Sequence, residues 1–207
     1  MKHIWDISPQ ISPDGLLFPG DEPYRIQWTS KFSQENPINL CAIRLSPHVG
    51  AHADAPLHYA KDAASISELD ILPFIGTCKV IHAIGCNPLI KVKHLQYVHA
   101  PIPERIIIRT RMHAATVWES DYTAIEPETI VWLHSQGVKL IGIDTPSVDP
   151  FDCTTMPCHK TLHRFNMRVL ENLVLDDVPE NDYELIALPL KLAGACASPV
   201  RAILRSL

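Results

Sequence analysis

Apolar and polar residues alternate in the first third of the chain, and this pattern predicts β-structure. Between residues 24 and 29, Tyr24, Ile26 and Trp28 alternate with polar residues, which is the period of a strand that is buried on one face. Short apolar runs rich in Ile and Val, bounded by Pro, Gly or Asp, predict further strands at residues 40–45, 77–84, 104–110, 138–143, 183–188 and 200–204.

Helices are expected at fewer places. Residues 127–136 predict one, with Pro127 in its first turn and Gly137 at its C-cap, and residues 89–97 predict another. Strands that are interleaved with a few helices are typical of a compact α/β domain with a mixed sheet. Because no repeat, low-complexity stretch or long linker divides the sequence, we expect a single domain over residues 1–207.

Composition narrows the class of protein. Of the 207 residues, 46% are hydrophobic and 20% charged, which are globular values, and the net charge of -5 without a dense Lys/Arg cluster argues against a nucleic-acid partner. No uncharged apolar run approaches the ~20 residues of a membrane span, and the first residues lack the apolar core of a signal peptide. The six cysteines form no CxxC pair and lie singly in apolar stretches, so we expect buried, reduced thiols and a cytoplasmic location.

Residues 48–59 carry the most informative pattern. Their odd positions are nearly all small or aliphatic, whereas the even positions include His48, His52, Asp54 and His58. In an extended chain these sets face opposite sides, so three imidazoles and a carboxylate would line one face. Such a polar row beside a buried strip is costly unless something pairs with it, and a divalent metal ion is the expected partner.

Geometry constrains how this segment can bind an ion. His52 and Asp54 would lie about 6.6 Å apart along a strand, whereas His48 and His52 would be about 13 Å apart if fully extended. The chain must therefore bend between them, and Gly50 permits the bend. Two other interpretations stay open: a helical segment with both rings on one face, and a metal-free core in which the histidines are only hydrogen-bonded.

A second polar cluster lies at residues 155–171. We expect a helix over residues 155–165, with a Thr155 cap and Pro157 in its first turn. A straight helix would separate His159 from Glu171 by about 18 Å. Asn166 tolerates the left-handed conformation that ends helices, so a strand over residues 167–174 could return Glu171 toward His159. From these residues alone His163, four positions after His159, is an equal candidate ligand.

The chain resembles a known family of enzymes. The segment His48–His58 matches the HxGxHxDAPxH motif of the cyclase-like metal-dependent hydrolases, whose domain is of the swivelling β/β/α type. The segments Trp5–Ser8, Pro19–Asp21 and Gly142–Asp149 and the end from Tyr183 to Arg205 are more closely similar to the bacterial kynurenine formamidase (arylformamidase) branch.

This resemblance implies a centre of two divalent ions, usually Zn²⁺, with Mn²⁺ as the other candidate. His48, His52 and Asp54 correspond to ligands of the first ion, with Asp54 also reaching the second. His159 corresponds to a ligand of the second ion and Glu171 to a ligand of both, which makes His163 a bystander. His58 corresponds to the catalytic acid/base. Phe18 stands where the family usually has a substrate-contacting Trp, so an aromatic platform remains but the indole N–H is lost.

The implied reaction is the hydrolysis of N-formyl-L-kynurenine, a small-molecule substrate, to L-kynurenine and formate in tryptophan degradation. Water activated by the two ions would attack the formyl carbonyl while His58 shuttles a proton to the leaving nitrogen. The resemblance also implies a homodimer. Two alternatives remain: a hydrolase of cyclic amides such as isatin with the same metal core, and a catalytically silent metal-binding protein, against which the presence of His58 argues.

Overall fold

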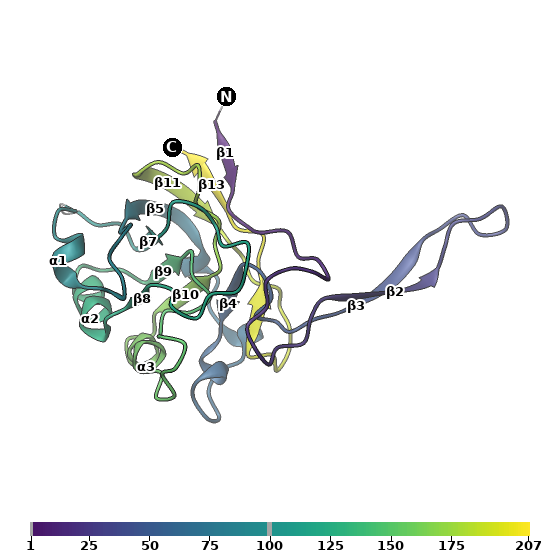
Figure 1. Cartoon of the computed structure of the whole chain (residues 1–207), viewed down its shortest axis with the longest axis horizontal. Coiled ribbons are helices and arrows are strands. Elements are labelled where there is room, and N and C mark those ends of the chain that lie inside the picture. The colour runs from purple at the N-terminus through teal and green to yellow at the C-terminus, as the bar shows by residue number, and fades with distance from the viewer. Residues whose placement is uncertain (1, 99–100) are drawn as a thin grey trace.

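A large mixed sheet organises the chain in the computed structural model, which describes residues 2–98 and 101–207 (Figure 1). The sheet contains nine strands, whose order across it is β1 (Ile4–Asp6), β13 (Ile203–Ser206), β11 (Asn181–Ile186), β5 (Ile75–His82), β7 (Arg105–Arg109), β9 (Leu140–Ile143), β10 (Arg168–Glu171), β4 (His52–Asp54) and β12 (Ala197–Pro199).

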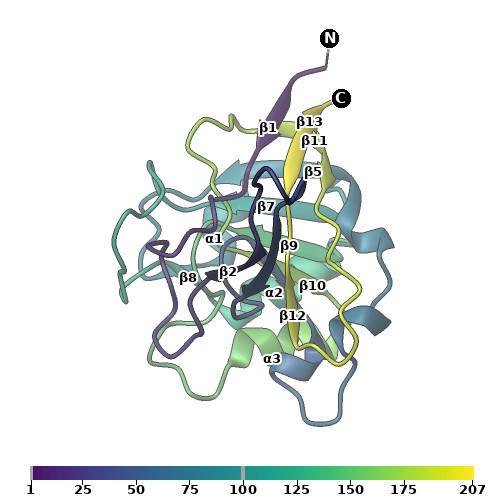
Figure 2. The same cartoon turned by 90° about the vertical axis from the view of Figure 1, so that its right-hand side faces the viewer.

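Parallel pairing is confined to the middle of the sheet. Strands β5, β7, β9 and β10 pair in parallel, and both flanks pair antiparallel. Strand β1 pairs with β13, so the two ends of the chain lie side by side at one edge (Figures 1 and 2). The short strands β4 and β12 form the opposite edge.

The helices lie together beside one face of the sheet (Figure 1). They are α1 (Val92–Leu95), α2 (Pro127–Ser135) and α3 (Pro157–Arg164), and a small parallel pair of β6 (Leu89–Ile90) with β8 (Ala124–Ile125) lies near them. Single 3₁₀ turns, η1 (Pro56–His58), η2 (Ile66–Glu68) and η3 (Leu72–Phe74), follow β4 in the chain. None of the helices in residues 2–98 and 101–207 has the length and apolar character needed to span a bilayer.

Both faces of the central strands are buried, and successive residues along a strand pack into two different hydrophobic cores. On β7, Ile106 and Ile108 pack with Ile130 and Leu133 of α2, whereas Ile107 belongs to a second core. Parallel strands that are buried on both faces have nearly continuous apolar sequences. The apolar runs at residues 104–110 and 138–143 therefore predicted strands correctly. The expected α/β class with a mixed sheet and few helices is confirmed.

The hairpin of β2 (Arg25–Ser30) and β3 (Leu40–Arg44) extends away from the sheet as an arm (Figure 1). Ile26 lies opposite Ile43 and Trp28 opposite Cys41, so the apolar residues share one face of the arm. The strand at residues 24–29 was therefore predicted correctly, but its predicted burial is wrong, since Trp28 remains 46% and Ile43 59% exposed.

Three other expectations need correction. Helix α3 begins after Met156, whose backbone is in the left-handed region (φ 48°) and whose side chain makes no capping hydrogen bond, so the predicted Thr155 cap is wrong. Residues 89–90 pair as β6 with β8, which leaves only a short helix, α1, where 89–97 was predicted. The last strand begins at Ile203 instead of residue 200, because Val200 N–H donates to Ala51 O beside β4.

The cysteines differ in their exposure. All six are free within the described part of the chain, and Cys78 and Cys158 are buried as expected. Cys41, in contrast, is exposed on the apolar face of the arm, so the expectation of burial is wrong there.

Candidate metal centre

Strand β4 places two of the predicted ligands inside the fold. It lies between β10 and β12, and its pairing sets Glu171 opposite His52 and Ala197 opposite Asp54. His52, Asp54 and Glu171 are all buried. Cross-strand pairing thus brings together residues that are more than a hundred positions apart in the sequence.

The bend predicted at Gly50 is present. Gly50 has φ +70°, and a Cβ there would lie 2.8 Å from Cγ1 of Ile11, so both conformation and space favour glycine. The bend directs His48 back toward β4 and brings its Nδ1 to 3.0 Å from Oδ1 of Asp54. His52 Nε2 lies 3.5 Å from the same oxygen, so His48, His52 and Asp54 form one cluster of candidate ligand atoms.

A second cluster shares Asp54. Asn166 has φ 52°, as expected for the residue that ends α3, and β10 then carries Glu171 back toward the helix. Nε2 of His159 lies 3.2 Å from Oδ2 of Asp54 and 3.5 Å from Oε1 of Glu171. The other Glu171 oxygen, Oε2, is 3.4 Å from Nε2 of His52. The two carboxylates therefore connect the two clusters.

Neighbouring groups fix the orientation of these side chains. His52 Nδ1 donates to Gly50 O at 2.9 Å, which leaves Nε2 as the free ligand atom. Asp149 accepts the backbone N–H of His159 and lies 2.6 Å from its Nδ1, so Nε2 of His159 points at the centre. Val148 N–H donates to Oε1 of Glu171 at 2.8 Å. Sequence reasoning assigned no role to Asp149.

The buried carboxylates of Asp54 and Glu171 are stable as anions only if positive charge lies close to them. Burial alone would raise the pKa of Asp54, but its hydrogen bond with His159 and the nearby histidine charges hold that pKa well below its usual range. Burial likewise opposes charge on His52, yet Glu171 and Asp54 raise its pKa to about 9. Asp149, Asp54 and Glu171 raise the pKa of His159 in the same way. Protonated imidazoles or a divalent cation would each offset the negative charge of the carboxylates, and binding of the cation would release the protons.

The donor set fits a divalent metal ion. Among the described residues, Asp54 Oδ1 is a buried oxygen without a hydrogen-bond partner. An unsatisfied buried carboxylate oxygen is costly, whereas a cation placed among it and the imidazole nitrogens of His48 and His52 would satisfy it. Imidazole and carboxylate ligands suit Zn²⁺ and Mn²⁺.

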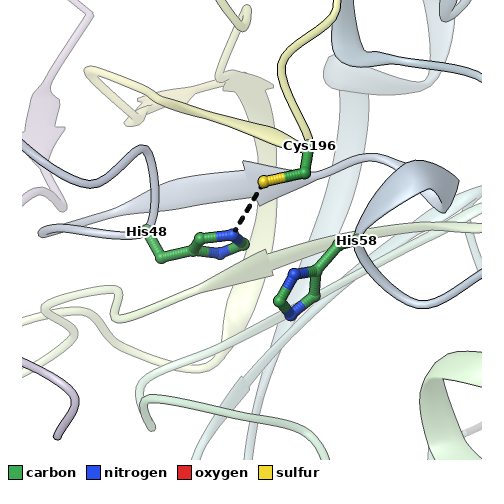
Figure 3. A group of neighbouring side chains, drawn as sticks. All are labelled: His48, His58 and Cys196. Atoms are coloured by element: carbon green, nitrogen blue, oxygen red, sulfur yellow. Dashed lines mark hydrogen bonds between the residues drawn. The ribbon is translucent and has the colours of Figure 1, made fainter. Parts of the chain in front are cut away.

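His58 does not belong to the first cluster, but together with His48 and Cys196 it forms a third group of candidate ligand atoms (Figure 3). It ends η1, is the solvent-exposed member of the group, and its ring centroid is 4.2 Å from that of His48 and 5.9 Å from that of His159. Although part of the side chain is exposed, desolvation by the surrounding protein lowers the pKa of His58. Figure 3 also shows Cys196, whose Sγ is 3.5 Å from the outward nitrogen Nε2 of His48. This thiol, which precedes β12, was missed because the sequence gives no signal that β12 pairs with β4.

An open cavity adjoins the centre. It has a volume of about 380 Å³, and His48 and Phe18 are both in its wall. The Phe18 ring makes edge contacts with Trp118 (centroids 5.1 Å apart) and lies 5.5 Å from Phe151. Trp118, also in the cavity wall, therefore supplies an indole next to the position where the expected family Trp is missing. His163 is exposed and belongs to none of the candidate ligand groups found among the described residues, and its role as a bystander stays a prediction.

The sequence matches a family model, and the fold matches solved structures of other proteins. The model of the family described as "Putative cyclase" matches residues 5–150. A structure titled as a potential metal-dependent hydrolase with cyclase activity superposes with a TM-score of 0.89 at 22% identity, covering 100% of this chain and 99% of the other. Isatin hydrolase A from Ralstonia solanacearum superposes with a TM-score of 0.84 at 23% identity, covering 100% and 92%. The family model thus places the chain in the putative cyclase class, and the superpositions show that it shares the fold of these two proteins.

Curated relatives are much closer in sequence. The kynurenine formamidase of Bordetella pertussis is 56% identical over 208 residues and that of Delftia acidovorans 51% identical over 206 residues, with 100% of this chain and at least 99% of the relative covered in both cases. The chain therefore belongs to the kynurenine formamidase family.

We predict that Asp149→Asn weakens divalent-ion binding about 10- to 100-fold, because the neutral amide no longer holds the His159 ring in the orientation that points Nε2 at the centre. The measurement is bound metal by elemental analysis after equilibration against a chelator of known affinity. Asp152→Asn is the matched control, since it removes an exposed carboxylate from the same loop. Equal retention of metal by the two variants would contradict the role given to Asp149.

Proposed function

We propose that this chain is a kynurenine formamidase that hydrolyses N-formyl-L-kynurenine to L-kynurenine and formate. The observation that carries the proposal is the pair of ligand clusters joined by Asp54, with His58 beside them and His48 in the wall of a cavity. The family membership supports the choice of substrate, since relatives that are 51–56% identical over the full length carry this name.

The centre is proposed to hold two divalent ions, Zn²⁺ in the first instance, with Mn²⁺ as the alternative. His48, His52 and Asp54 would hold the first ion, and Asp54, His159 and Glu171 the second, with Glu171 contacting both. The contacts that Asp54 and Glu171 already make in both clusters support shared ligation. When bound, such ions lower the pKa of water and polarise a carbonyl oxygen.

His58 is proposed to move the proton that the leaving nitrogen needs. Its ring lies outside the two clusters that Asp54 joins, 4.2 Å from the ring of His48 between centroids, and desolvation lowers its pKa, which favours the neutral imidazole. A neutral imidazole accepts a proton from the attacking water and returns it to the aryl nitrogen as the amide bond breaks. Phe18 is proposed to contact the aromatic ring of the substrate, together with Trp118.

The test of this function is the turnover of N-formyl-L-kynurenine by purified protein before and after chelation of its metal. We expect hydrolysis that is lost with the metal and restored by Zn²⁺ or Mn²⁺. Isatin serves as the competing substrate, because the cyclic-amide hydrolases share the fold. Faster turnover of isatin than of N-formyl-L-kynurenine would favour the alternative, and no turnover of either would favour a silent metal-binding protein.

A substitution separates ligation from proton transfer. His58→Ala should keep its metal but lose about 10²–10⁴ in kcat, because only general acid/base catalysis is removed. His52→Ala should lose metal and activity together. The control is His163→Ala, which removes an exposed imidazole from α3 and should leave both kcat and metal content at the wild-type level. Loss of metal from His58→Ala would move this residue into the ligand set.

The working unit is proposed to be a cytoplasmic homodimer of single-domain chains. Pairing of β1 with β13 in one sheet supports a domain that spans residues 1–207, and buried free thiols suit a reducing compartment. The arm supports the dimer: Ile26, Ile43 and Trp28 face one side, and this chain leaves that side uncovered. A continuous apolar face of this kind is typical of an interface, and a second copy is its proposed occupant.

Charge placed on this face should therefore separate the subunits. The double substitution Ile26→Glu/Ile43→Glu is expected to convert a dimer to a monomer, because two carboxylates would be buried without partners. Molar mass by light scattering after size exclusion gives the answer. Gln27→Glu/Ala42→Glu adds the same charge to the opposite face of the arm and should leave the dimer intact. A wild-type monomer would refute the proposed assembly.

A further inference from the structure

The cavity beside the metal centre contains a pair of opposite charges that the chemistry at the centre does not use. Two segments form most of its wall: residues 9–18 and residues 114–119. Its volume of about 380 Å³ suits a small aromatic molecule. His48 lies in the wall and links the cavity to the ligand clusters, while Arg111 and Glu119 supply charge to the same wall.

Arg111 has an unused donor in this wall. Its Nη1 donates to Glu119 Oε2 at 3.1 Å, and its side chain is only 18% exposed. Its Nε, however, is buried and has no hydrogen-bond partner among the described residues. Native structures rarely leave such an atom unpaired, so the geometry points to an acceptor that the chain itself does not provide. A guanidinium binds a carboxylate through two of its nitrogens, which is the acceptor of best fit.

Glu119 supplies the complementary charge. Its side chain is 47% exposed, so one face of the carboxylate remains available to a ligand while the other contacts Arg111. Together the two side chains are neutral. A ligand with only one charge would attract one member of the pair and repel the other, whereas a zwitterion can match both. An α-amino acid group carries this charge pair on adjacent substituents of one carbon.

We propose that Arg111 binds the α-carboxylate and Glu119 the α-ammonium group of an aromatic amino-acid substrate, with its ring against Phe18 and Trp118 and its formamide directed to the centre. The inference rests on the formamidase function proposed above, and it names the residues that would bind the amino-acid group of the substrate. It explains how the cavity would select N-formyl-L-kynurenine over isatin, since the cyclic amide has neither charged group.

The experiment compares two linear formamides on the metal-loaded enzyme. N-formyl-L-kynurenine carries the amino-acid group, and N-formylaniline has the same scissile bond without it. For Arg111→Met and for Glu119→Gln, we expect kcat/KM for N-formyl-L-kynurenine to fall about 10- to 100-fold, the size expected for loss of a hydrogen bond to a charged group. The value for N-formylaniline should stay within about twofold of wild type. L-Kynurenine should also become a correspondingly weaker competitive inhibitor of N-formylaniline hydrolysis.

Controls separate recognition from folding. Arg205→Met removes an arginine that is also paired with a glutamate, Glu184, but lies at the far edge of the sheet and outside the cavity, so it should leave the ratio of the two kcat/KM values unchanged. Glu119→Gln is nearly isosteric and partly exposed, and it tests the site should Arg111→Met fail to fold. An equal loss on both substrates, or none on either, would overturn the proposal. A wild-type enzyme that cleaves neither formamide would instead refute the formamidase function.

Discussion

The carboxylate of Asp54 is the element on which the rest of the site depends. It is buried, one of its oxygens has no hydrogen-bond partner among the described residues, and imidazoles approach it from His48, His52 and His159. A buried anion in this position is tolerable only if cations or protons lie close to it. The neighbouring carboxylates raise the pKa values of His52 and His159, which favours the protonated imidazoles that would offset this negative charge. The same arrangement makes the centre a strong ligand for divalent ions, which compete for those positions.

Two features of the fold place the other ligand residues next to Asp54. Antiparallel pairing of β4 with β10 places Glu171 next to His52, and the left-handed turn at Asn166 returns the chain from α3 to the sheet. Asp149 then couples the start of α3 to the centre through the backbone and ring of His159. The site therefore needs both the register of β4 against β10 and the position of α3, and a shift in either would separate the two ligand clusters.

Much of this could be inferred from the sequence because the signals were local. The parity of residues 48–58, the bend at Gly50 and the turn at Asn166 each follow from rules that act over a few residues. Cys196, Trp118 and Arg111 could not be found in this way, since what places them at the site is tertiary packing of distant segments. The arm shows the same limit: its alternation correctly predicted a strand with one apolar face, but burial of that face depends on neighbours that a local pattern does not reveal.

The most direct test of the shared role of Asp54 is a crystal structure of the zinc-loaded protein with anomalous differences measured at the zinc edge. Two peaks per chain, about 3.5–4 Å apart, are expected. One would lie among His48, His52 and Asp54 and the other among Asp54, His159 and Glu171, with one oxygen of Asp54 directed at each. A single peak, or two peaks that Asp54 does not bridge, would contradict the shared role of Asp54.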